Sequence, residues 1–162
     1  GDQCREDAVD LTSFRLEISM LKDITVQAIQ PEVKELLSYS VFPDPEAVDQ
    51  AAASYQTGRS RLFGYEEDGL LLGVIGFDVD QDELTIRHLA VLPENRGKGY
   101  GRGLILELLL EVQPKPARVI AETDEEAVNF YRSIGFEVYS LGEKYPGVER
   151  FRCIYEVEES EE

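Results

Sequence analysis

The sequence is poor in the residue types that build metal centres and disulfide frameworks. Its 162 residues include one histidine, His88, and two cysteines, Cys4 and Cys153, which stand near opposite ends of the chain. This set contains no Cys/His spacing typical of zinc and argues against a disulfide framework. We therefore expect no metal site built by the protein.

Long apolar runs are also missing. No stretch approaches the roughly 20 apolar residues that a membrane-crossing helix requires, and residues 1–7 are polar and acidic, unlike a secretory signal. The sequence predicts a cytoplasmic protein without a membrane partner.

Positive charge is scarce: 16 Lys and Arg stand against 33 Asp and Glu, for a formal net charge of -17. Such a field repels nucleic acid and anionic lipid, and it favours a cationic small molecule or a basic peptide as partner. The same composition is equally explained as a device for solubility, and both interpretations stay open.

What the chain does contain is enough apolar material, 43%, for one domain. Periodicity and turn residues predict strands at 13–19, 61–66, 70–79, 84–91, 118–121, 136–141 and 150–157, and helices at 31–37, 46–55, 104–112 and 124–134. The order β-α-α-β-β-β-α-β-α-β-β indicates a single α/β (α+β) domain over residues 1–162, with loose tails at 1–12 and 158–162. Its central sheet is expected to be mixed, mostly antiparallel and flanked by helices.

The most informative segment, residues 92–103, joins a strand directly to a leucine-rich helix. Four of its alternate positions are glycine, and Arg96, Lys98 and Arg102 give it positive charge in an otherwise acidic chain. Backbone N–H groups at a helix N-terminus favour an anion, so this segment predicts a phosphate site.

Two common phosphate motifs do not fit this segment. A P-loop requires Ser or Thr after Gly-Lys, whereas Lys98 is followed by Gly99. A dinucleotide fingerprint requires glycines at offsets zero, two and five, and no starting glycine here satisfies all three.

The pattern that fits is Arg/Gln-x-x-Gly-x-Gly/Ala, present as residues 96–101 (RGKGYG) after Leu89-Ala90-Val91. A second pattern follows at Ala127, Phe130-Tyr131 and Gly135-Phe136. Together these motifs, between residues 84 and 136, resemble the GNAT superfamily of N-acetyltransferases.

The resemblance implies a GNAT-like fold and transfer of the acetyl group of acetyl-CoA to a primary amine of a small molecule or peptide. It places backbone contacts with the pantetheine arm on the strand before the loop and the pyrophosphate on amides 97–102. The cofactor-binding residues that it implies are Leu89, Ala90, Val91, Arg96, Gly97, Lys98, Gly99, Tyr100, Gly101, Arg102 and Asn129.

Tyr131 matches the family's tyrosine beside the sulfur, and the resemblance makes it the general acid that protonates the leaving thiolate. A phenol is protonated at neutral pH, as this role requires. Tyr131 as a packing residue and Asn129 as a solvated helix residue are the alternatives. Asp124 stands where relatives often carry Asn, and it can cap the following helix.

No general base is assigned. Regular alternation groups His88 with Leu84, Ile86 and Ala90, away from Arg87, Leu89 and Val91, and makes a packed, hydrogen-bonded His88 the expectation. Glu122 is a second candidate, and Arg87 cannot serve.

The acceptor cleft is expected between residues 31–55 and 141–150, and a homodimer is possible because dimers are common among GNAT proteins. Two other functions stay open: an acyl-CoA sensor without catalysis, and an interaction domain whose glycine loop is only structural.

Overall fold

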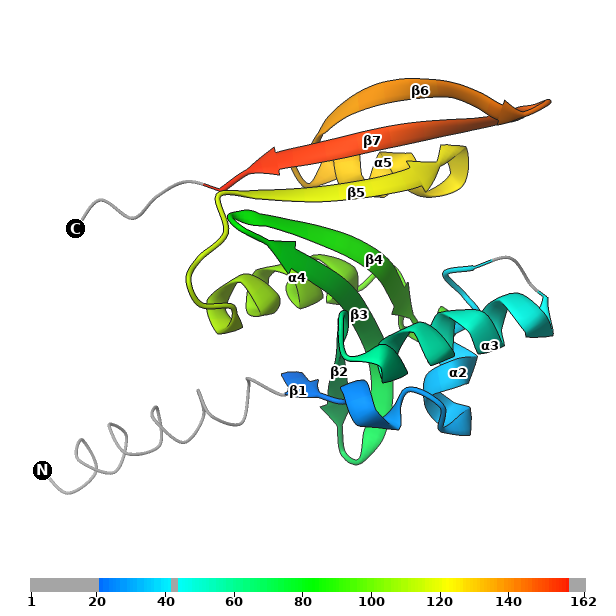
Figure 1. Cartoon of the computed structure of the whole chain (residues 1–162), viewed down its shortest axis with the longest axis vertical. Coiled ribbons are helices and arrows are strands. Elements are labelled where there is room, and N and C mark those ends of the chain that lie inside the picture. Colours follow the sequence, from blue (N-terminus) through cyan, green and yellow to red (C-terminus); the bar gives the residue numbers. More distant parts are fainter. Residues whose placement is uncertain (1–20, 42–43, 158–162) are drawn as a thin grey trace, which may run out of the picture.

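A single seven-stranded sheet organises the protein (Figure 1). The computed structural model describes residues 21–41 and 44–157, so the strand predicted at 13–19 and the predicted tails lie outside the described residues. The strands are β1 (Leu21–Asp23), β2 (Arg61–Glu67), β3 (Leu70–Asp80), β4 (Glu83–Val91), β5 (Arg118–Asp124), β6 (Glu137–Tyr145) and β7 (Val148–Glu156). The α-helices are α2 (Pro31–Leu37), α3 (Pro45–Ser54), α4 (Tyr100–Glu111) and α5 (Glu125–Ser133), and short 3₁₀ turns occupy Thr25–Gln27, Tyr55–Thr57 and Pro93–Asn95.

The spatial order of the strands is β1-β2-β3-β4-β5-β7-β6, and every neighbouring pair is antiparallel except β4 and β5. β4 and β5 are parallel because α4 returns the chain to the end of the sheet at which β4 begins. A mixed, mostly antiparallel sheet with this element order confirms the predicted fold class.

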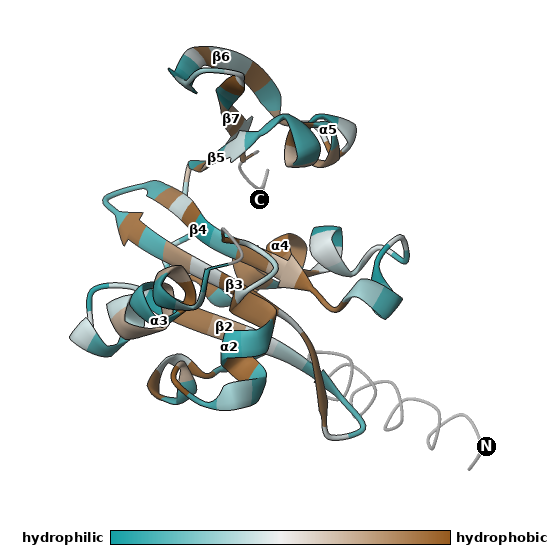
Figure 2. Cartoon of the chain, turned by 90° about the vertical axis from the view of Figure 1, so that its right-hand side faces the viewer, coloured by the Kyte–Doolittle hydropathy of each residue, from teal (hydrophilic) through white to brown (hydrophobic). Residues whose placement is uncertain are grey.

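Helices cover both faces of the sheet. One apolar cluster joins α4 and α5 to β3 and β4 through residues such as Leu104, Val128 and Phe77. A second cluster joins α2 and α3 to the opposite face, with Leu36 and Val74 at its centre. Figure 2 shows the apolar strand β3 between α4 and the α2–α3 pair.

Three predicted boundaries were wrong. Helix α4 begins at Tyr100 rather than at residue 104, because Gly99, with φ of 89°, is the last left-handed residue of the loop and Gly101 and Gly103 are helical. Strand β5 continues to Asp124, where the carboxylate caps α5. The two strands of the last hairpin continue to Tyr145 and from Val148, beyond their predicted ends at residues 141 and 150.

A β-bulge in β4 changes the direction of its side chains. Ile86 is opposite Phe77 and His88 is opposite Gly76, so Arg87 is an extra residue with no partner in β3. Beyond Arg87 the alternation is inverted, and His88 faces the α2–α3 side of the sheet.

Because of this bulge, the predicted grouping of the β4 side chains was wrong. Leu84 and Ile86 share the α4 side with Leu89 and Val91. His88 keeps only Ala90 from its predicted group. Strict alternation fails here because it assumes one residue for each residue of the partner strand.

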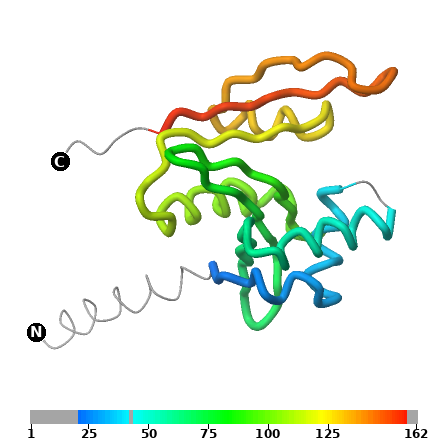
Figure 3. Tube along the Cα trace, in the orientation of Figure 1, coloured from blue at the N-terminus to red at the C-terminus, as the bar shows by residue number. Residues whose placement is uncertain are grey.

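The parallel ladder between β4 and β5 is short. It joins Glu83–Ile86 to Arg118–Ala121, and the two strands then diverge (Figure 3). The remainder of β4, from Arg87 to Val91, therefore has one unpaired edge in the middle of the sheet.

Candidate active site

A cleft of about 490 Å³ opens where β4 and β5 separate. Its walls come from β4, from the end of β5, from the first turns of α4 and α5, and from the chain after α2. The lining residues include Ile86–Val91, Arg96, Gly101, Glu122–Asp124, Tyr131 and Arg150.

Tyr131 lies on the α5 wall of this cleft and is only 6% exposed. Its ring makes edge-to-face contacts with Phe130 and Phe136, with centroids 5.0 and 5.1 Å away. Burial, reinforced by Cys153, raises the pKa of Tyr131 well above its usual value, so the phenol stays protonated at neutral pH. Tyr131 is thus a packed residue that borders the cleft and is protonated at neutral pH, and its role as general acid stays a prediction.

The glycine-rich loop lies between this cleft and the beginning of α4. Gly97 and Gly99 have positive φ angles of 76° and 89° and are exposed. A side-chain Cβ at either position would meet no protein atom within 4 Å, so the glycines serve backbone conformation and not internal packing. Their free space lets another group approach the backbone at the N-terminus of a twelve-residue helix.

Arg96 connects the loop to the strand before it. Its Nε donates a hydrogen bond to the carbonyl oxygen of Val91 at 3.2 Å, and its guanidinium lies 5.3 Å from the ring centroid of Tyr39. Tyr39 comes from the chain after α2, and sequence reasoning did not single it out because no local pattern links residues so far apart.

The cleft brings together about half of the predicted site residues. Those that line it are Leu89, Ala90, Val91, Arg96, Gly101 and Tyr131. Gly97, Lys98, Gly99 and Arg102 lie along the adjacent loop and first turn of α4, and all four are exposed or half-buried.

Two predicted contacts point elsewhere. Tyr100 donates a hydrogen bond to Glu67 Oε1 at 3.1 Å and packs against Tyr65. Asn129 is exposed and accepts a hydrogen bond from Arg132 Nη1 at 2.6 Å. The predicted cofactor contacts, through the backbone amide of Tyr100 and through Asn129, stay predictions.

His88 lines the cleft and is held by Tyr55. The Tyr55 hydroxyl oxygen lies 2.5 Å from Nδ1 of His88, and the two rings meet edge to face. Burial, reinforced by the nearby Arg87, lowers the pKa of His88 to about 4, so the imidazole is neutral at pH 7. The expected hydrogen-bonded histidine is confirmed, but its ring also borders the cleft, and Tyr55 was not foreseen as its partner.

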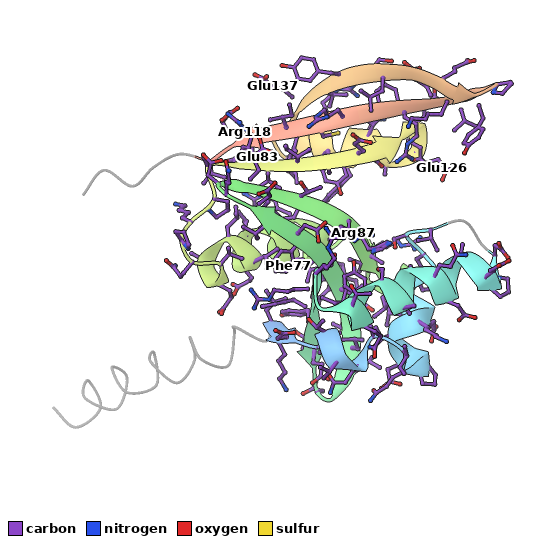
Figure 4. The ribbon with its side chains drawn as sticks, viewed as in Figure 1. Phe77, Glu83, Arg87, Arg118, Glu126 and Glu137 are labelled. Carbon is purple, nitrogen blue, oxygen red and sulfur yellow. The ribbon has the colours of Figure 1, made fainter. Side chains whose placement is uncertain are left out.

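A second polar group surrounds Arg87, which Figure 4 shows beside the gap between β4 and β5. Its Nη1 donates a hydrogen bond to Ser60 Oγ at 2.7 Å and lies 3.9 Å from Asp78 Oδ2. Ser60 is 2% exposed and donates in turn to Asp78. These contacts fix the arginine of the bulge on the cleft wall.

The acidic candidates of the cleft already have protein partners. Glu122 Oε2 is 3.7 Å from Arg152 Nη1. Asp124 accepts hydrogen bonds from the backbone amides of Glu126 and Ala127, both at 3.1 Å, which confirms its capping role.

Across residues 21–41 and 44–157, no three His, Cys, Asp or Glu side chains are grouped so that they could hold a metal ion. Over the same part of the chain, every helix is too short or too polar to span a bilayer.

A sequence profile described as "Acetyltransferase (GNAT) domain" matches residues 58–138, which contain β2 to α5 and both sequence motifs. The chain belongs to the GNAT acetyltransferase family. The matched residues include the loop, Tyr131 and most of the cleft lining, but not Tyr39, Ser40 or Arg150.

Two proteins of known sequence resemble this GNAT chain. It is 30% identical over 125 residues to UPF0157 protein YqkA of Bacillus subtilis (strain 168), covering 75% of the chain and 36% of that protein. It is 38% identical over 72 residues to Peptidyl-lysine N-acetyltransferase YjaB of Escherichia coli (strain K12), covering 39% of the chain and 48% of that enzyme. The chain thus spans about a third and about half of the lengths of these relatives.

Solved structures share the fold. A protein of Desulfovibrio desulfuricans assigned to the GNAT family superposes with a TM-score of 0.72 at 18% identity, covering 84% of this chain and 97% of that one. A GNAT acetyltransferase of Elizabethkingia anophelis with acetyl-CoA bound gives a TM-score of 0.62 at 17% identity, with coverages of 85% and 97%. At these identities the likeness supports the fold alone.

Proposed function

We propose that this protein is an N-acetyltransferase that moves the acetyl group of acetyl-CoA to a primary amine of a small molecule or peptide. The observation that carries the proposal is the cleft between β4 and β5, which is lined both by the unpaired edge of β4 and by Tyr131. Family membership supports acetyl transfer, and the names of YjaB and of the Elizabethkingia enzyme support an amine acceptor and acetyl-CoA as donor.

The cofactor site follows from a strand edge that has no partner strand within the described residues, and from the amides at the beginning of α4. The edge of β4 at Leu89–Val91 faces the gap in the sheet, where an extended amide-containing chain can pair with it. The amides at the beginning of α4 and the exposed glycines before it can bind a diphosphate. Arg96 supplies positive charge between the edge of β4 and the beginning of α4.

Tyr131 would act on the leaving group. The neutral amine attacks the thioester carbon, the C–N bond forms, the C–S bond breaks, and the sulfur takes the proton of the Tyr131 hydroxyl as it departs. The ammonium proton passes to solvent water, which also reprotonates the phenolate. Burial of Tyr131 supports this role because the buried phenol keeps its proton until the thiolate forms beside it.

The test uses the whole chain in two stages. Saturating acetyl-CoA should raise the melting temperature by mass action, whereas CoA-free buffer should not. Release of CoA thiol should then be followed against a panel of primary amines. If acetyl-CoA raises the melting temperature but no amine causes release of CoA thiol, the protein is an acyl-CoA sensor. If acetyl-CoA leaves the melting temperature unchanged, the glycine-rich loop is only structural. Cytoplasmic location, a homodimer, and the absence of nucleic-acid, membrane and metal partners stay predictions from the sequence.

A further inference from the structure

Side chains from three strands line the cleft on the α2–α3 side of the sheet. The bulge turns His88 to this side. On β5 and β7, Ala121 and Cys153 belong to the core under α5, so their neighbours Glu122 and Arg150 project from the other face.

Negative charge on this face is largely neutralised by the protein itself. Glu122 is paired with Arg152, and Asp124 caps α5. Glu126, at the beginning of α5 (Figure 4), also lines the cleft and has no Lys or Arg nitrogen within 4.0 Å among the described residues. The chain as a whole is strongly acidic, whereas the three carboxylates of the cleft are matched by three arginines, Arg87, Arg96 and Arg150.

Positive and hydrogen-bond donor groups remain. Within the described residues, Arg150 has no carboxylate within 4.0 Å, although it lines the cleft and is half-buried. Arg87 contacts Ser60 and Asp78 through Nη1. Its other N–H groups have no hydrogen-bond partner in the described part of the protein.

His88 adds an oriented donor to this set. Tyr55 is 1% exposed. Within the described residues, the one hydrogen-bond partner of its hydroxyl is Nδ1 of His88. A buried phenol must donate its proton, so Nδ1 accepts it and the proton of the neutral ring resides on Nε2. The ring edge left for a ligand is therefore an N–H donor, which removes His88 as a candidate general base.

From these donors we infer that the acceptor is an amine that also carries a carboxylate, held by Arg150 and by Nε2–H of His88. This inference rests on the proposed acetyl transfer. A carboxylate matches the geometry of guanidinium and imidazole N–H groups, and its fixation would leave the adjacent amine free to face the thioester. Amino acids and small amino-acid analogues fit this description.

The first experiment compares amines that differ only in the carboxylate. Amino acids, their amides and the corresponding decarboxylated amines are offered to the full chain at saturating acetyl-CoA. The amino acid should be acetylated with a kcat/KM about 10-fold to 100-fold above its amide, as expected for loss of charge-assisted hydrogen bonds. Equal or greater kcat/KM for the amide or the decarboxylated amine would overturn the inference.

Variants assign the effect to residues. Arg150→Gln and His88→Gln should each raise the KM for the amino acid about 10-fold and leave the KM for acetyl-CoA nearly unchanged. Arg118→Gln is the matched control, because Arg118 pairs with Glu83 and Glu156 at the far end of β5. If Arg118→Gln has the same effect as Arg150→Gln, the carboxylate site is wrong.

A binding measurement separates this inference from the proposed function. Calorimetric titration of amino acid and amide into the complex with CoA requires no turnover. Saturable binding of the amino acid that is lost in Arg150→Gln supports the carboxylate site even if no acetyl transfer is detected. Absent binding, or equal binding of the amide, rejects it even if other amines are acetylated.

Discussion

Gly76 provides the space into which the hydroxyl of Tyr55 fits: a Cβ at position 76 would lie 1.7 Å from that oxygen. Gly76 is directly opposite His88 in the β3–β4 ladder. Because Gly76 has no side chain, the hydroxyl of Tyr55, the residue that follows α3, can pass over β3 and contact His88 on β4.

Gly76→Ala should therefore displace Tyr55 and destabilise the protein. Forced overpacking of this kind costs about 1–3 kcal/mol, so chemical denaturation should show a lower free energy of unfolding. Gly103→Ala is the control, since a Cβ there meets nothing within 4 Å and lies inside α4. It should be neutral or stabilise by up to about 1 kcal/mol; equal effects of both changes would contradict the packing argument.

Gly99→Ala should weaken acetyl-CoA binding beyond its effect on stability. Gly99 and Gly58 have φ angles of 89° and 83°, and neither has a neighbour that a Cβ would meet. Alanine should cost about 1 kcal/mol of stability at each position. Only Gly99→Ala should raise the Kd for acetyl-CoA, measured by calorimetry, because only Gly99 precedes α4. A similar rise in Gly58→Ala would refute the proposed loop site.

Tyr131→Phe should reduce kcat by about 100-fold or more, in keeping with the loss of a general acid, and should leave acetyl-CoA binding intact. Tyr139→Phe is a suitable comparison because Tyr139 is 51% exposed on β6 and its hydroxyl bonds to Glu137. Steady-state thiol release measures both variants. Full activity of Tyr131→Phe would show that Tyr131 is only a packing residue.

His88 should make stability depend on pH. Its pKa is near 6.5 in an unfolded chain and is lowered to about 4 in the folded protein by burial and by Arg87. Between these values the unfolded state binds more protons, so the free energy of unfolding falls as the pH drops from 6.5 to 4. The contribution is complete above pH 6.5 and amounts to about 3 kcal/mol at most.

His88→Gln should remove this part of the pH dependence, as read from urea denaturation at a series of pH values. Tyr55, which also contacts the ring, does not titrate in this window because burial raises its pKa. Carboxylates elsewhere in the protein titrate equally in both proteins, so the difference between the two curves isolates His88. Parallel curves would mean that the histidine is not buried as described.

The sequence predicted the order of the elements and the position of the glycine-rich loop, because both depend on local patterns. Apolar periodicity marked the strands, and Asp124 signalled the beginning of α5. The start of α4 was missed because glycines at alternate positions from 97 to 103 hid the point at which the helix begins. Local patterns do not distinguish a helical glycine such as Gly101 from a left-handed one such as Gly99.

The acceptor side of the site depended on tertiary structure. The extra residue Arg87 has no signature in the sequence, yet it determines which face His88 occupies. The pairing of Tyr55 with His88 joins residues 33 positions apart through the space above Gly76. Neither feature follows from composition or periodicity. The positions of the residues proposed to bind the acceptor could therefore be predicted least well.

The short ladder between β4 and β5 has a mechanical consequence. Within the described residues, four residue pairs make up the whole ladder between the first four strands of the sheet and the last three. Beyond this ladder the two parts are held together by the apolar cluster on the α4–α5 side, which contains residues of both, such as Ile86 and Ala121. A molecule bound between the diverging ends of β4 and β5 would restrict the motion of the two parts. The backbone amides of both strands should then exchange with deuterated water more slowly.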